Sequence, residues 1–149
     1  MKKIILLITV ILGISNYHYV GNEINIFNEI VKIEKKEKVL ETYYGEITAY
    51  GPDCKGCIGI TASGYNVKKT IYYNDKEYGK IRILAADRKL PFGTIVRIKE
   101  LNILGIVLDR GSAIGFSKRA YFDLLNPSEK EINKFGRKKA TFEILRLGY

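Results

Sequence analysis

The stretch "GIVLDRGSAIG" at residues 105–115 decides the fold. Its apolar run, residues 106–108, predicts a short buried strand. The acid Asp109 follows at once, with Gly111 and Gly115 in the loop beyond it. Acids and glycines are common where strands end, so a plain turn is one interpretation. The other is a carboxyl fixed at a strand end, beside a loop that allows close approach of a ligand.

Outward from this stretch, residues 43–149 alternate between short apolar runs and turns. The runs predict strands within "YYGEITAY" (43–50), "KIRILAAD" (80–87), "LPFGTIVRIKEL" (90–101), "LGIVLD" (104–109) and "KATFEILRL" (139–147). "NPSEKEINKFG" predicts a helix that Asn126 or Ser128 caps and Gly136 ends. The polar segment 64–80 predicts an excursion between strands. Many short strands with one clear helix favour a mostly-β domain, either a sandwich or a barrel.

The first 42 residues have a different character. Lys2 and Lys3 precede an apolar run at residues 4–12, which is typical of a secretory signal. The run is shorter than the roughly 20 residues of a membrane-spanning helix. No clean cleavage site follows, so residues 1–20 are expected to be a signal peptide or an uncleaved anchor through residues 4–15. Residues 21–42 are expected to be a connector. The protein is expected to be secreted or associated with the cell wall.

The composition of the chain limits the classes of molecule that it is expected to bind. The 149 residues carry a formal charge of +9 and are 46% hydrophobic, so the chain is globular and attracts polyanions. It contains no helix-turn-helix, zinc-finger or RNA-binding signature, so nucleic acid is not favoured over an acidic cell-wall polymer. His18 is the only histidine and lies in the expected leader. A processed chain would have no serine–histidine chemistry and no histidine-rich metal site.

Three aspartates are the candidate chemical groups. Asp87 and Asp109 each follow an apolar run, and Asp123 lies in "YFDLL" (121–125). Burial raises the pKa of a carboxyl, as a general acid near neutral pH requires. The structural alternative is that each accepts backbone N–H bonds in a turn. Three acids without an imidazole favour acid chemistry on a neutral substrate such as a glycosidic bond.

Cys54 and Cys57 form the motif "CKGC". In an exported protein they can form a disulfide or remain free thiols, and the motif alone does not decide. A zinc site would need two further ligands, and the chain has no second cysteine pair. We therefore expect neither a metal nor a cofactor.

Five segments together resemble a known family. They are "ITAYGPDCKGCIGITASG" (47–64), "ILAADRKLPFGTIVRI" (83–98), "GIVLDRGSAIG", "YFDLL" and "FGRKKATFEIL" (135–145), and they occur in the order of the three-aspartate (3D) domain family. That family includes stationary-phase-survival and cell-wall-binding proteins of Gram-positive bacteria. It is similar to the catalytic domain of membrane-bound lytic transglycosylase A. The resemblance implies a six-stranded double-psi β-barrel at residues 43–149, with one or two short helices, that cleaves peptidoglycan glycan strands.

The resemblance also implies roles. Asp109 matches the acid, which would protonate the glycosidic oxygen and then accept the proton of the sugar C6 hydroxyl to give a 1,6-anhydro product. Asp87 and Asp123 match the other two aspartates of the family, which accompany this acid. The expected substrate contacts are Thr61, Tyr65, Gly111 and Gly115.

The chain also departs from the family pattern. It has "DRGSAIGF" where family members commonly have "DTGGAIKG". Its "LPFGT" and "DRG" resemble expansin-like and rare-lipoprotein-A-like relatives, some of which bind glycan without cutting it. A non-catalytic binding barrel therefore stays open as an alternative. A water-using glycosidase is a third possibility, which would need Asp109 paired with a second carboxylate at inverting or retaining distance. The oligomeric state is not indicated.

Overall fold

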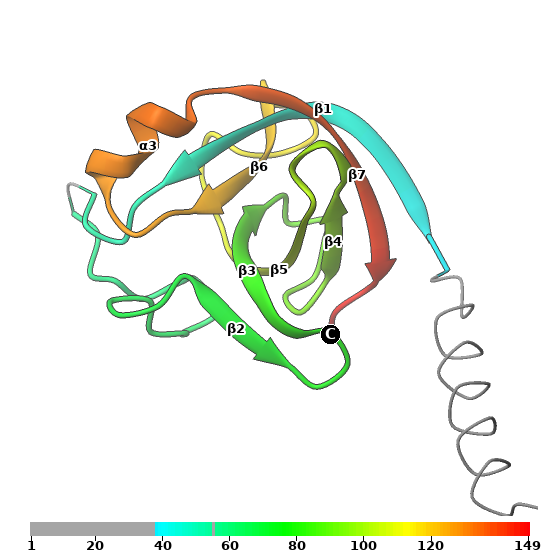
Figure 1. The fold of residues 1–149 in the computed structure, drawn as a ribbon, viewed down its shortest axis with the longest axis horizontal. Coiled ribbons are helices and arrows are strands. Elements are labelled where there is room, and N and C mark those ends of the chain that lie inside the picture. Colours follow the sequence, from blue (N-terminus) through cyan, green and yellow to red (C-terminus); the bar gives the residue numbers. More distant parts are fainter. Residues whose placement is uncertain (1–37, 55) are drawn as a thin grey trace, which may run out of the picture. The chain divides into compact units, whose positions relative to one another are not determined.

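The computed structural model describes residues 38–54 and 56–149 (Figure 1). The expected leader and most of the expected connector lie outside the described residues. No helix in the described part is long and apolar enough to cross a membrane. In chain order the elements are β1 (Glu41–Tyr50), β2 (Tyr72–Asp75), β3 (Gly79–Ala86), β4 (Ile95–Ile98), the 3-10 turn η1 (Lys99–Leu101), β5 (Ile103–Asp109), β6 (Ala120–Leu125), α3 (Glu129–Phe135) and β7 (Lys138–Arg146).

Six of the strands in the described residues close into a barrel. They pair in the order β3-β5-β4-β7-β1-β6, and a further pairing of β6 with β3 closes the ring. β1 pairs with β6 and β3 with β5 in parallel, and the other pairs are antiparallel. β2 lies outside the ring and pairs with the first half of β3. The prediction of a mostly-β barrel with a short helix is confirmed, and the double-psi connection stays a prediction.

The strands bury two apolar clusters, one on each face. Along β3, Leu84 and Ala86 join one cluster while Ile81 and Ile83 join the other, as the period of two requires. The first cluster draws on all six barrel strands and fills the interior. The second lies under the excursion between β1 and β3, which contributes Val67 and several half-buried tyrosines. The loop after β1 and this excursion therefore cover the outer face of the barrel on the side that carries the site.

The strands differ from the expected ones in three places, one of which is β6, because no strand was expected at residues 120–125. β1 begins at Glu41, so the last two residues of the expected connector belong to the barrel. The excursion contains the strand β2, whose sequence "YYND" is too polar to give an apolar signal.

Helix α3 begins and ends where the sequence predicts, but its first turn is capped differently. Ser128 is the N-cap residue and makes no side-chain capping bond. Asp53, far away in sequence, accepts the Glu129 backbone N–H at 2.7 Å. Gly136 ends the helix with a φ of 65°. A long-range carboxylate thus replaces the local cap that Asn126 or Ser128 was expected to supply.

Candidate functional site

Two of the three predicted aspartates face each other across one strand. Ala85 of β3 is the register partner of Asp109 in β5 and also of Asp123 in β6. Directly paired residues project on the same face of a sheet, and neighbouring strands lie about 4.8 Å apart. The two carboxyl groups therefore stand on one face with only a methyl side chain between them.

An irregularity in β5 produces this arrangement. The pairing of β3 with β5 shifts by one residue, from Leu84 opposite Val107 to Ala85 opposite Asp109. The extra residue is Leu108, which is buried in the second apolar cluster. A bulge of this kind re-aims the side chains that follow it. Without the shift, Leu108 would stand opposite Ala85 and the acid would leave this position.

Asp109 and Asp123 line a cavity of about 340 Å³. Its other walls come from the loop at residues 51–54 and 56–60, from Tyr50 and Val67, and from Arg110 and Gly111. The volume lies within the range of roughly 300–1,000 Å³ of small-molecule sites. The cavity therefore combines two acids with a lining that is otherwise mostly apolar.

The Asp109 carboxylate accepts three hydrogen bonds. The Tyr50 hydroxyl donates to Oδ2 at 2.7 Å, and the backbone N–H groups of Ala62 and Arg110 donate to Oδ1, each at 2.8 Å. Burial and then the charge of Asp109 raise the pKa of Tyr50, so its hydroxyl stays a donor. This acid is held firmly in place as an acceptor.

Asp123 has a different environment. Burial is the main cause that raises its pKa, from 3.8 to about 6, and the negative charges of Glu129 and Asp109 add to the effect. The Thr48 hydroxyl donates to Oδ1 at 2.8 Å and opposes the rise. Thr48 is the register partner of Asp123 on β1. Asp123 is thus a carboxyl that is half protonated near pH 6.

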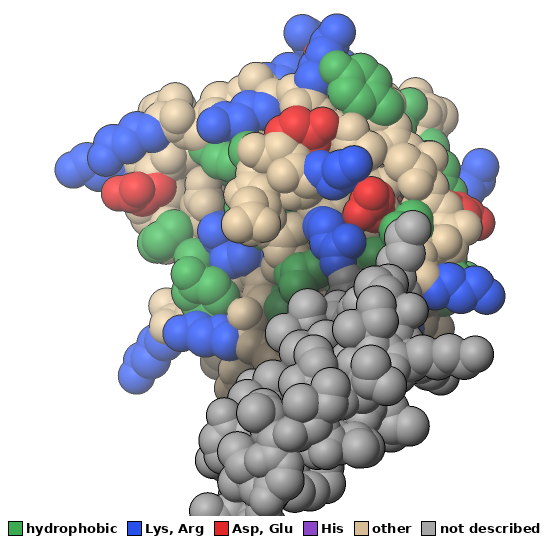
Figure 2. All heavy atoms as spheres, turned by 45° about the vertical axis from the view of Figure 1, so that its right-hand side comes forward, with side chains coloured by type: hydrophobic (Ala, Val, Ile, Leu, Met, Phe, Trp, Pro, Cys, Tyr) green, Lys and Arg blue, Asp and Glu red, His purple; other side chains and the backbone are tan. Residues whose placement is uncertain are grey.

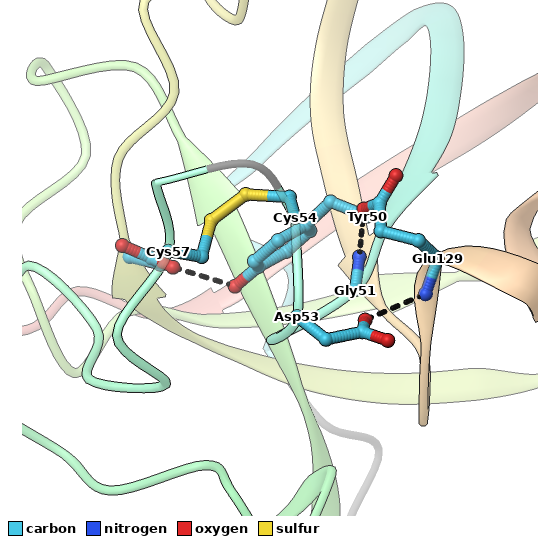
Figure 3. The surroundings of a disulfide bond; sticks show 7 residues. Tyr50, Gly51, Asp53, Cys54, Cys57 and Glu129 are labelled. Atoms are coloured by element: carbon cyan, nitrogen blue, oxygen red, sulfur yellow. Dashed lines mark hydrogen bonds between the residues drawn. A yellow bond between two sulfur atoms is a disulfide. The ribbon is translucent and has the colours of Figure 1, made fainter.

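The loop at residues 51–54 and 56–60 forms one wall of the cavity and is tied to α3 (Figure 3). The Gly51 N–H donates to Glu129 Oε1 at 2.8 Å, and the Glu129 N–H donates to Asp53. Cys54 and Cys57 form a disulfide within this wall. Figure 3 shows the disulfide beside Tyr50, which leads from β1 into the loop. The sequence left this pair open between disulfide and thiols.

The structure places Asp87 outside this cavity, in a turn. Its carboxylate accepts the backbone N–H of Lys89 at 2.9 Å and that of Phe116 at 3.0 Å. These bonds, the Lys89 one first, lower its pKa. Gly115 lies against it, and a Cβ there would stand 2.4 Å from Asp87 Oδ2. Asp87 and Gly115 therefore join two loops rather than line the cavity with the other acids.

The other residues that were expected to contact substrate also fall into two groups, because Gly111 lines the cavity and Thr61 and Tyr65 do not. Thr61 is buried and organises its own loop, since its Oγ1 accepts the Tyr65 N–H at 3.0 Å. Tyr65 packs edge-on against Tyr73, with ring centroids 5.3 Å apart, over the second apolar cluster.

Sequence reasoning missed four residues of the site. Thr48 and Tyr50 hold the two acids, Ala85 spaces them, and Glu129 adds charge near Asp123. Only Tyr50 had a signal, as a tyrosine within the matched segment at residues 47–64.

On the coloured part of the face in Figure 2, Lys and Arg side chains are spread out and do not gather in one patch. Among residues 38–54 and 56–149, no group of three or more histidine, cysteine or acidic side chains is placed to hold a metal ion.

Comparison with known proteins gives a relative without a described activity. No family model matches the chain. It is 35% identical over 105 residues to YorM, an uncharacterised protein derived from the SPbeta prophage of Bacillus subtilis (strain 168). The aligned part covers 68% of this chain and 41% of YorM. The chain thus spans about two fifths of the length of this relative.

Proposed function

We propose that the protein is an exported peptidoglycan lytic transglycosylase of the three-aspartate type, with a double-psi barrel. The observation that carries the proposal is the pair Asp109 and Asp123, which face one cavity on either side of Ala85. Most enzymes that break a glycosidic bond use two carboxyl groups that lie in different environments. The excess of basic residues suits an anionic cell wall.

The contacts support a division of roles between the two acids. Asp123, with a pKa of about 6, donates its proton to the oxygen between N-acetylmuramic acid and N-acetylglucosamine as the C1–O bond breaks. The new Asp123 carboxylate then takes the proton of the C6 hydroxyl, whose oxygen attacks C1 and closes the 1,6-anhydro ring. Asp109, fixed as an acceptor, stabilises the positive charge that develops at C1. The family resemblance instead implies both proton transfers for Asp109, so the two assignments make different predictions.

A glycan-binding barrel without activity is the second candidate. The observation that favours it is that both oxygens of Asp109 already accept hydrogen bonds from the protein. In this candidate the acids hold the binding loops and orient sugar hydroxyls.

Mass spectrometry of digested cell-wall sacculi separates the candidates. Anhydro-muropeptides support the transglycosylase, new reducing ends indicate a water-using glycosidase, and retained binding without products indicates the binding barrel. Asp109→Asn and Asp123→Asn should both lose cleavage under the proposed division. An active Asp123→Asn beside an inactive Asp109→Asn would return both proton transfers to Asp109. Glu131→Gln, which removes an exposed acid of α3, is the matched control.

A further inference from the structure

A second cavity lies outside the two-acid site, beside the two loops that Asp87 connects. It measures about 580 Å³ and is lined by Glu41, Tyr43, Lys89, Leu90, Pro91, Phe116, Tyr121 and Leu147. No residue in this set lines the cavity of Asp109 and Asp123. Two loops with no sequence proximity meet here, one after β3 and one after β5.

Three aromatic rings form its floor. Tyr43 and Phe116 stack with ring centroids 4.5 Å apart, and Phe116 meets Tyr121 edge-on at 5.3 Å. All three pack against the barrel interior while remaining half-buried. The floor is therefore a packed aromatic surface with part of its area exposed.

The Asp87 carboxylate fixes this floor. It accepts the N–H of Lys89 from one loop and the N–H of Phe116 from the other. The close approach of Gly115 to Asp87 leaves no room for a side chain at that point. The two hydrogen bonds to Asp87 fix the distance between the two loops, and the cavity lies between these loops.

The rim of the cavity carries one charge of each sign. Glu41 and Lys89 are both exposed, and the Tyr43 hydroxyl donates to the Glu41 carboxylate and so orients it. The rim therefore offers an acceptor and a donor and has no net charge. Such a lining suits a neutral ligand with an apolar face and a polar edge.

We propose that this aromatic cavity binds an N-acetylhexosamine unit of a glycan, at a point separate from the two-acid cleft. A pyranose ring presents C–H groups on its face and hydroxyl and acetamido groups at its edge, which match the aromatic floor and the Glu41–Lys89 rim. The two sites share the loop after β5, since Gly111 lines one and Phe116 the other. The choice of a sugar as ligand rests on the proposed function, and the cavity would hold the glycan while the cleft acts on it.

The test is an NMR titration of the ¹⁵N-labelled full chain carrying Asp109→Asn with the tetramer of N-acetylglucosamine. The Lys89 and Phe116 amides, which bond to Asp87, report on the aromatic cavity. The Ala62 and Arg110 amides, which bond to the residue at position 109 in the parent protein, report on the cleft. We expect saturable shifts at the first pair.

Two variants make the result specific. Glu41→Gln combined with Lys89→Ala removes the charged rim from exposed positions and should weaken binding at the aromatic cavity about tenfold or more. Arg88→Ala removes a neighbouring exposed charge that does not line the cavity, and should bind as the parent does.

Shifts confined to the cleft amides, no shifts at all, or unchanged affinity in the rim variant would each overturn the inference. Cleavage of sacculi is measured separately. A chain that cleaves but fails this titration loses only the inference. A chain that binds here but does not cleave loses only the proposed activity.

Discussion

Replacing Asp123 by asparagine should stabilise the protein at pH 8 and have a much smaller effect at pH 4. Burial raises the pKa of this carboxyl from 3.8 to about 6 in the folded protein. The folded state therefore holds a proton that the unfolded state releases, and stability falls as the pH rises between these two values. Above the higher value both states are ionised and the full penalty remains.

The magnitude follows from the shift. One pKa unit corresponds to about 1.36 kcal/mol, so the rise from 3.8 to about 6 costs the ionised parent roughly 3 kcal/mol at pH 8. At pH 4 the same linkage gives only about 0.5 kcal/mol. Asparagine cannot ionise, so the variant escapes this penalty. The variant-minus-parent difference in unfolding free energy should therefore be larger at pH 8 than at pH 4 by about 2–3 kcal/mol.

Guanidinium unfolding followed by circular dichroism measures both free energies. Any change that is independent of pH, such as an altered bond to Thr48, cancels when the two pH values are compared. Glu131→Gln controls for the loss of one negative charge. The same variant-minus-parent difference at both pH values would refute the reasoning, because it would mean that burial does not shift the ionisation of Asp123.

Further predictions concern the cleft and its surroundings. Glu129→Gln removes a charge that raises the pKa of Asp123, so the falling limb of the pH–rate profile on sacculi should move to lower pH. Ala85→Leu should fill the space between the two acids and abolish cleavage, while circular dichroism shows the barrel retained. Asp87→Ala should cost about 0.5–1.5 kcal/mol of unfolding free energy at pH 7, because the partly buried Phe116 N–H loses its acceptor while the exposed Lys89 N–H can bond to water. The lowered pKa of Asp87 makes that loss smaller in acid, as its carboxylate is protonated. Gly115→Ala should be destabilising at every pH by chemical denaturation, since its Cβ would meet Asp87 at a φ of 153°.

Most strands of the barrel could be predicted because their signals are local, but β6 (Ala120–Leu125) was not among the expected strands. Apolar runs bounded by glycine, proline or acids mark β3, β4, β5 and β7, and the Ser128–Gly136 interval marks α3. β2 has no such run, because its residues pair with β3 while remaining mostly half-buried. The cap of α3 comes from Asp53, and no local pattern connects residues that lie 76 positions apart.

The site could be predicted only in part, for a reason that lies in the register. Asp87 and Asp109 carry the same sequence signal, an acid at the end of an apolar strand. The bulge at Leu108 brings Asp109 opposite Ala85, where Asp123 also arrives from β6. A shift of one residue reverses the face of every side chain that follows, and hydrophobic periodicity alone does not locate such a shift. The division of three similar aspartates into a facing pair and a loop connection is therefore a property of strand pairing.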